Sequence, residues 1–442
     1  MRTFRDIRRT RLTALWTSCT VLCLALPLLL PMQAAAEGDW RANIGLRSEY
    51  TDNANRSETD KLSERQDDVE LGLGGSYANR WVTFEAGYNA SEHRFSEGSQ
   101  EDRSLLQGDS ELAIGQPTDP LDLVLSHRRR TVLNAPDDID LLSNNDERTI
   151  VSAMPSARWR PTGVDLLMVR AQFSDVDYRF RPERNSERLG GSLVWQRQLS
   201  EISQLLATAQ HTEIAFDDAP QADYEYRAAN LSYQTTLRRL QYQVQVGYNE
   251  SNPEVGESLS SPSYLIDVQF GEGANRWILN ASQFITDNST GSGNQGELGG
   301  FTPGDSSAGE LDQLERTRAE LRWTNQGLCV RCTTTASVYW QSDDFRDDTQ
   351  DRDELGLRLS VGYQISSRSS MDLSLQRRDQ EFEAGATDRS DFQEDRVSAG
   401  YEYNFANDVA LNLFLGHHKR KSDDGNREYD ENTGGLGLRY TF

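Results

Sequence analysis

Apolar and polar residues alternate along most of this chain, and the last seven residues show the pattern most clearly. In Leu436-Gly437-Leu438-Arg439-Tyr440-Thr441-Phe442, every second side chain is apolar. A period of two gives a β-strand one apolar face and one polar face. The C-terminus is therefore predicted to be a strand.

The same period recurs throughout the chain and predicts about 20 strands, within a range of 18 to 22. The predicted strands lie at about 40–50, 69–77, 82–90, 106–114, 121–125, 149–159, 167–173, 189–195, 204–211, 229–233, 240–248, 264–270, 277–281, 319–323, 334–340, 355–363, 371–375, 397–405, 409–415 and 436–442. Short turns and long polar loops alternate between them. An even number of strands joined this way is typical of an all-β fold, a single antiparallel transmembrane β-barrel with short periplasmic turns and long extracellular loops.

Two soluble folds compete with the barrel. A β-sandwich could also end in such a strand, and a β-propeller also repeats strands, although a propeller repeats about four per blade and this chain repeats two. Tryptophans favour the barrel, because membrane barrels carry aromatic girdles at the interfaces. Six of them fall near the short-turn ends of predicted strands: Trp40, Trp81, Trp159, Trp195, Trp277 and Trp323.

Composition is compatible with a membrane barrel despite its soluble appearance. Hydrophobic residues make up 36% of the chain, and the mean hydropathy is -0.71. A barrel strand needs apolar residues only at alternate positions, so a low average does not argue against it.

The N-terminus predicts export. A basic segment is followed by a mostly apolar run (12–32) and by Ala34-Ala35-Ala36. These are the parts of a secretory signal peptide, so we predict a signal peptide at 1–36 and a barrel domain at 37–442, with an uncleaved membrane helix as the alternative. The formal charge of -24 would become about -28 without that segment, which excludes nucleic-acid binding.

The polar face of the strands carries the candidate functional residues. Both charge signs in a wide lumen suit a water-filled pore, although a salt-bridged rigid interior is the alternative. The candidate pore-lining residues are Gln243, Gln245, Arg318, Glu320, Arg322, Arg358, Asp372, Arg378, Glu402 and Arg439. The loop at 287–311 is expected to fold inward and narrow the lumen.

Catalytic and cofactor chemistry find little support. Cys329 and Cys332 form a candidate disulfide in an oxidising compartment, with two unbonded thiols as the alternative. His417 and His418 lie near loop ends, but no serine or acid accompanies them at a telling spacing. We therefore expect no enzymatic activity, no cofactor and no metal.

Two motifs resemble known proteins. A final strand with Tyr440 and the terminal Phe442 resembles the insertion signal of bacterial outer-membrane barrels. Tyr50-Thr51-Asp52-Asn53, after the first mature strand, resembles the outer-membrane β-barrel porins, and more narrowly those associated with exosortase (PEP-CTERM) systems. The resemblance implies a Gram-negative outer-membrane protein with a part in exopolysaccharide export or surface assembly.

The leading hypothesis from the sequence is an outer-membrane channel. A non-conducting scaffold or adhesion barrel and a lipid-active enzyme remain as alternatives. Expected partners are outer-membrane lipid and lipopolysaccharide, the barrel-assembly machinery and components of polysaccharide export. Acidic segments in predicted loops either bind divalent ions shared with lipopolysaccharide or are simply solvated; they are Asp343-Asp344, Asp347-Asp348, Asp423-Asp424 and 428–431.

Overall fold

The computed structural model describes residues 37–134, 138–289, 311–346, 350–383, 390–405 and 408–442. The predicted signal peptide at 1–36 lies outside them. The strands are β1 (Glu37–Thr51), β2 (Glu64–Ala78), β3 (Val82–Phe95), β4 (Arg103–Ile114), β5 (Leu121–Leu133), β6 (Asn145–Trp159), β7 (Asp165–Tyr178), β8 (Ser186–Ser200), β9 (Ser203–Phe216), β10 (Tyr224–Thr236), β11 (Leu240–Pro253), β12 (Leu259–Glu272), β13 (Asn275–Asp287), β14 (Gln313–Asn325), β15 (Cys332–Phe345), β16 (Arg352–Ser366), β17 (Ser369–Phe382), β18 (Phe392–Asn404), β19 (Val409–Ser422) and β20 (Tyr429–Thr441). Short 3₁₀ helices lie at Leu142–Asn144, Pro182–Arg184, Pro220–Ala222 and Gly425–Arg427.

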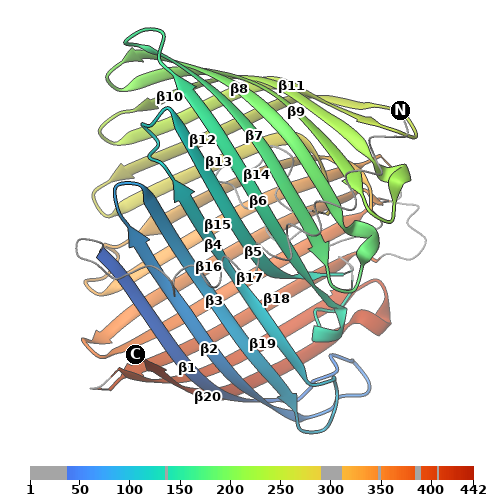
Figure 1. The fold of residues 1–442 in the computed structure, drawn as a ribbon. Coiled ribbons are helices and arrows are strands. Elements are labelled where there is room, and N and C mark those ends of the chain that lie inside the picture. The colour runs from blue at the N-terminus through green and yellow to red at the C-terminus, as the bar shows by residue number, and fades with distance from the viewer. Residues whose placement is uncertain (1–36, 135–137, 290–310, 347–349, 384–389, 406–407) are drawn as a thin grey trace, which may run out of the picture.

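These strands form one closed antiparallel barrel (Figure 1). Each strand pairs with the next along the chain, and β1 pairs with β20, as in Ile44 opposite Tyr440. The prediction of about 20 strands is confirmed at 20. Every predicted segment coincides with one strand, apart from overhangs of one residue at Phe405 and Phe442.

The strands extend further toward the long loops than the apolar pattern indicated. The prediction for β5 stopped at Leu125, yet the strand continues to Leu133 through His127, Arg128, Arg129 and Arg130. Pairing of the backbone continues where the alternation of apolar residues ends, because ladder hydrogen bonds do not depend on the side chain.

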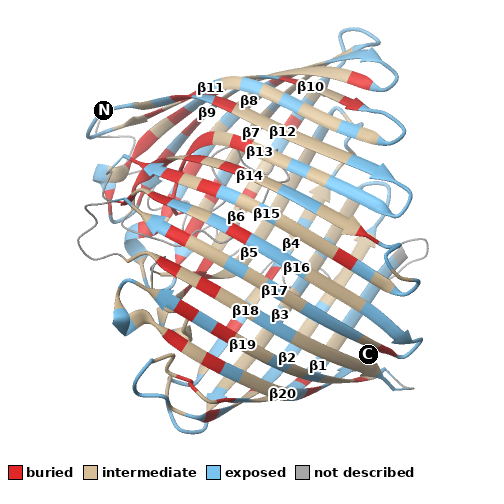
Figure 2. Ribbon diagram, turned by 180° about the vertical axis from the view of Figure 1, so that it is seen from behind, coloured by how far each residue is buried: buried red, intermediate tan, exposed pale blue. Residues whose placement is uncertain are grey.

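The two ends of the barrel differ in their connections. At one end tight turns such as 201–202 and 367–368 join the strands. The first residues of β1 and the C-terminus lie at this end. At the other end the connections are longer, as at 52–63, 134–144 and 288–312. Most buried positions lie toward this long-loop end (Figure 2).

The outer surface carries a belt of apolar side chains. Large hydrophobic side chains such as Leu46, Leu73, Val246 and Leu438 are exposed on it. Trp40, Trp159 and Trp277 lie near the tight-turn ends of their strands, and Trp81 lies in the adjoining turn, as predicted. None of the helices in the described ranges is long and apolar enough to cross a membrane.

Candidate functional site: the barrel lumen

All ten candidate pore-lining residues lie on the inner face of the barrel. On β11 the exposed apolar residues Val244, Val246 and Tyr248 face outward, so Gln243 and Gln245 face inward. The same alternation places the other eight inside: Arg318, Glu320, Arg322, Arg358, Asp372, Arg378, Glu402 and Arg439. Their role as pore lining remains a prediction.

Several of these side chains are paired yet open to solvent. Arg322 Nη2 lies 2.6 Å from Glu320 Oε1, and the Arg322 side chain is 49% exposed. Arg439 Nη2 lies 3.2 Å from Glu402 Oε2 and is 47% exposed. Inward charges that remain this exposed indicate open space inside the barrel toward the tight-turn end.

Arg318 and Arg378 have different surroundings. The Arg318 side chain is 9% exposed and its Nη1 donates to Gln341 Oε1 at 2.9 Å. Arg378 Nη2 lies 3.0 Å from Glu394 Oε2, whose side chain is 4% exposed. These two belong to packed clusters nearer the long-loop end.

One part of the inner wall has almost no charge. On β8 to β11 the inner face presents amides and hydroxyls, which we call the neutral wall: Ser192, Gln196, Gln204, Thr208, Gln210, Asn230, Ser232, Gln234, Gln241, Gln243 and Gln245. They bond to one another across strands, as in Gln196 Nε2 to Gln204 Oε1 at 2.6 Å and Gln243 Nε2 to Ser232 Oγ at 3.2 Å. A side-chain amide can make up to four hydrogen bonds, and a hydroxyl can both donate and accept.

At the long-loop end, the tip of the β13–β14 hairpin leaves the wall. Pairing between β12 and β13 stops at Tyr264 opposite Gln283, whereas pairing between β13 and β14 continues to Asp287 opposite Gln313. We call residues 284–289 and 311–316 the infolded tip. It separates from β12, while its residues 314–316 stay paired with β15. Its Ile285 is fully buried in an apolar cluster with Ile214, Phe216, Tyr224, Tyr226 and Ala228 of β9 and β10.

Polar contacts fix the infolded tip against strands that are not its neighbours in the sheet. Arg188 of β8 lies 2.9 Å from Asp287 Oδ2, and the Tyr224 hydroxyl of β10 donates to the same oxygen. Arg148 of β6 donates to the Ser289 carbonyl at 3.4 Å. The tip therefore reaches across the lumen and narrows it.

Two groups mark where the hairpin leaves the wall. In the amide orientation that satisfies both of its polar atoms, the Asn249 side-chain oxygen accepts from Ile285 N at 3.0 Å. Its nitrogen donates to Ser261 O at 2.9 Å. Ser251 Oγ donates to Gln313 Oε1 at 2.6 Å. The expectation of an inward loop at 287–311 agrees with its described ends, and residues 290–310 lie outside the described part.

A buried charge cluster supports the base of the tip. Asp343 of β15 is fully buried, with Arg316 Nε at 2.6 Å from its Oδ1 and Arg352 Nη2 at 2.7 Å from its Oδ2. Burial of charges is tolerated only when they are paired and hydrogen-bonded. This carboxylate therefore holds three strands in register.

A second segment crosses the opening from the other side. In the β5–β6 loop, Asp140 lies 3.6 Å from Arg396 of β18, and its carbonyl accepts from Arg56 of the β1–β2 loop. The Asp138 carbonyl accepts from Arg420 of β19 at 3.1 Å. The long-loop end is thus bridged by two segments that come from different parts of the wall.

The Tyr50-Thr51-Asp52-Asn53 motif closes the seam between β1 and β20. Thr51 Oγ1 donates to Glu431 Oε1 at 2.8 Å, and Asp52 accepts from both the backbone and the side chain of Asn432 at 2.7 Å. Asn53 is fully buried and donates to Asp430 O at 3.0 Å. Burial acts to raise the pKa of Asp52, but the Asn432 hydrogen bonds outweigh it and hold that pKa below its usual value.

The cysteines and histidines take structural positions. Cys329 and Cys332 are joined by a disulfide in the tight turn between β14 and β15. His418 contacts Tyr429 and Arg396, and His417 contacts Asn432 at 3.0 Å. Neither histidine has a serine within hydrogen-bond distance among the described residues.

Sequence reasoning missed the residues that organise the long-loop end. Asp343 was predicted to be loop charge, which is wrong, because it lies within β15 and is fully buried. Asp287 was named only as the first residue of the inward loop, and Glu394 not at all, although each of the three carboxylates has an arginine on another strand. By alternation along their strands, Asp343 and Glu394 are inward positions, whereas Asp287 belongs with the outward Trp277 and Leu279. Asp287 reaches Arg188 only because the hairpin folds inward, which alternation cannot predict.

Comparison with known proteins gives only distant similarities. No protein-family model matches the chain, and no curated protein matches it. Among solved structures, it is similar to the outer membrane protein opdK from Pseudomonas aeruginosa, at 12% identity and a TM-score of 0.41, over 91% of this chain and 98% of that one. The FrpB iron transporter from Neisseria meningitidis gives 9% identity and a TM-score of 0.46, over 91% and 82%. Similarities this low support no conclusion, so fold and function rest on the geometry described above.

Proposed function

We propose that this chain is an outer-membrane β-barrel of a Gram-negative bacterium and that it forms a water-filled channel. The location is supported by the closed sheet, by its exposed apolar outer face and by the tryptophans at the tight-turn end. In that membrane the tight turns face the periplasm and the long loops face outside.

The single observation that carries the channel is the exposure of paired charges on the inner face toward the tight-turn end. Arg322 and Arg439 face inward and remain about half exposed. A barrel of this strand number is too wide for its own side chains to fill. The infolded tip then acts as the narrowest part, at the outer end.

Single-channel recording in planar bilayers tests this function. Purified wild-type protein should give discrete conductance steps. Heat-modifiable mobility in detergent gels identifies folded protein. If folded protein inserts into the bilayer and never conducts, the proposed channel is wrong.

The cargo we propose is polysaccharide, in keeping with the resemblance of Tyr50-Thr51-Asp52-Asn53 to exosortase-associated barrels. The neutral wall supports this cargo. Amides and hydroxyls can exchange hydrogen bonds with sugar hydroxyls, and the absence of charge avoids strong trapping of ions there. Passage requires binding that is favourable yet weak and repeated, which a row of similar groups supplies.

Current block by a neutral glucan oligosaccharide tests the cargo. We expect transient block in wild type and weaker block in Gln243→Leu with Gln245→Leu. Arg358→Gln, on the charged side of the lumen, is the matched control and should keep the block. Conductance without any block would reject polysaccharide and leave the channel standing.

A second candidate function is a non-conducting surface scaffold. It is favoured by the two segments that bridge the long-loop end. Silence of the wild type in recording, together with conductance after removal of the infolded tip, would support the scaffold.

A further inference from the structure

The part of the β5–β6 loop that crosses the long-loop end is held differently from the infolded tip. We call its residues 138–144 the mouth strap. The infolded tip is fixed by the apolar cluster around Ile285 and by the buried pair of Arg188 and Asp287. Among the described residues, none of the mouth strap belongs to an apolar cluster of the core. Its attachment to the far wall is polar.

Three arginines make the contacts across the opening. Arg396 of β18 lies 3.6 Å from the Asp140 carboxylate, and the two side chains are 41% and 44% exposed. Arg56 donates to the Asp140 carbonyl, and Arg420 donates to the Asp138 carbonyl at 3.1 Å. A half-exposed ion pair contributes little stability, because water screens it. This attachment is therefore weak enough to break and re-form while the barrel stays folded.

Release of the strap leaves each of these arginines with a counterion on the wall. Arg396 and Arg420 both lie against Glu394 of β18, at 3.5 and 3.1 Å. Arg56 lies 2.8 Å from Glu431 of β20. Breaking a buried ion pair is costly because the remaining charge loses its partner. Here the wall keeps a partner for every charge, so departure of the strap has a small cost.

The base of the strap has backbone pairing on one side. The β4–β5 ladder ends at Gly108 opposite Arg129, and none of residues 103–107, all of them described, pairs with β5. A side-chain bond from Gln107 Nε2 to Thr131 Oγ1 at 2.8 Å joins the two strands there. The end of the β5–β6 hairpin is paired with the wall through β6 instead. Segments with few backbone hydrogen bonds open locally at low free energy.

Bonds at Leu142 tie the strap near this base. The Leu142 carbonyl accepts from Arg103 of β4, and its N–H donates to the Gln100 side chain at 2.8 Å. The contacts with β18 and β19 lie at the other end, in residues 138–140. The strap can therefore lose its far contacts while it keeps its near ones.

We propose that the mouth strap is a gate of the channel and that the ion pair of Asp140 with Arg396 is its latch. This inference rests on the proposed channel. The structure then shows the latched state, with the strap across the outer opening. Release turns residues 138–140 away from β18 and β19. The infolded tip sets the conductance of the open pore, and the strap sets how often the pore is open.

Single-channel recording of a double-mutant cycle tests the latch. Asp140→Asn and Arg396→Gln should each raise the open probability about threefold, the size expected for a half-exposed pair. The double variant should match the single variants, because all of them remove the same contact. The conductance of each step should stay at the wild-type value, since the infolded tip is intact.

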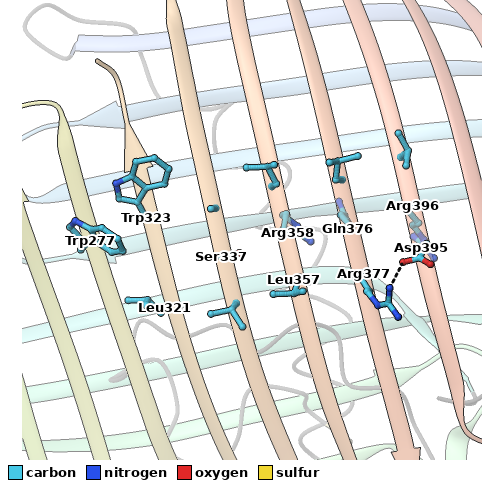
Figure 3. A pocket seen from close by; sticks show the side chains of 15 residues that line it. Trp277, Leu321, Trp323, Ser337, Leu357, Arg358, Gln376, Arg377, Asp395 and Arg396 are labelled. Carbon is cyan, nitrogen blue, oxygen red and sulfur yellow. Dashed lines mark ion pairs between the residues drawn. The ribbon is translucent and has the colours of Figure 1, made fainter. Parts of the chain in front are cut away.

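A pair on the outer wall supplies the matched control. Arg377 and Asp395 lie 3.9 Å apart with similar exposure, 49% and 42%, and Figure 3 shows them joined there. Arg377→Gln and Asp395→Asn should leave the open probability unchanged.

Locking the strap should have the opposite effect. Asp140→Cys combined with Arg396→Cys and joined by a bis-maleimide should abolish the openings, whereas the same protein before coupling should conduct. The native Cys329 and Cys332 are bonded to each other and do not take up the reagent. Arg377→Cys combined with Asp395→Cys, coupled in the same way, should conduct as wild type does.

The failures of the gate and of the channel are distinguishable. Heat-modifiable mobility identifies folded variants. Unchanged open probability in both latch variants, or openings that persist in the locked protein, would overturn the gate and leave the channel standing. Silence of both the wild type and Asp140→Asn would refute the proposed channel itself, and the gate with it.

Discussion

The two ends of the lumen use the same residue types in opposite ways. Toward the tight turns, Arg322 and Arg439 pair with acids but remain about half exposed. Toward the long loops, Arg316 and Asp343 pair with almost no exposure, at 2% and 0%. Strand periodicity assigns all four side chains to the inner face. The infolded tip and its neighbouring strands bury the pair at the long-loop end.

This difference separates two roles for inward charge. Exposed pairs contribute little stability because water screens them, and in the proposed channel they would be available to ions in transit. Buried pairs are costly to break, because the remaining partner loses both its solvent and its counterion. The long-loop end should therefore decide stability and the narrowest width, and the other end should tolerate change.

The largest expected effect follows removal of the infolded tip. Replacing residues 284–316 with Asn-Gly would join Gln283 to Thr317, which already face each other in register. Single-channel conductance should rise several-fold, because the segment that reaches β6, β8 and β10 is gone. The control variant replaces residues 421–428 with Asn-Gly and should change the conductance little. If removal of residues 284–316 leaves the conductance unchanged, the infolded tip is not the constriction.

Breaking the buried carboxylate should have the next largest effect. Asp343→Ala removes the buried counterion of Arg316 and should lower the free energy of unfolding by about 3–5 kcal/mol. Urea unfolding in lipid measures it. Asp372→Ala, an exposed inward carboxylate on β17, should cost less than about 0.5 kcal/mol. Similar losses in both variants would contradict the contrast between the two ends.

The seam motif should contribute a smaller amount. Asn53→Ala removes a buried side chain that bonds Asp430 O and Ser57 O, at an expected cost of about 1–3 kcal/mol. Asn89→Ala, at an exposed inner position of β3, serves as the control in the same unfolding assay. Equal midpoints for Asn53→Ala and wild type would show that the motif does not close the seam.

The smallest effect is a dependence on pH at the long-loop end. Burial raises the pKa of Asp351 to about 6, with help from the Asp344 and Glu383 carboxylates, although a hydrogen bond from Phe345 N opposes the shift. Because the folded state holds this proton more tightly than the unfolded chain, the contribution to stability is complete below the ordinary pKa of 3.8 and is lost as pH rises through about 6. Asp351→Asn should reduce the change of the unfolding midpoint with pH between pH 3.8 and about 6. A slope identical to that of wild type would assign the dependence to another group.

The alternation of apolar and polar residues determined the fold of this protein. Alternation at Leu436, Leu438 and Tyr440, repeated along the chain, specified the strands, their faces and their number, because a period of two leaves a strand only one way to present an apolar side. It also placed Gln243 and Arg439 inside. Each of these properties depends on residues close together in the chain.

The tertiary structure alone decided which inward residues are wet and which are buried. Periodicity treats Arg318 and Arg322 alike, yet one is 9% exposed and the other 49%. Arg318 is covered by Gln341 and by the Tyr339 ring of the next strand. Nearer the long loops, a hairpin folds inward and brings Asp287 to Arg188, residues separated by about a hundred positions in sequence. The cause is long-range packing, in which buried charges must find partners wherever the closed barrel brings them together.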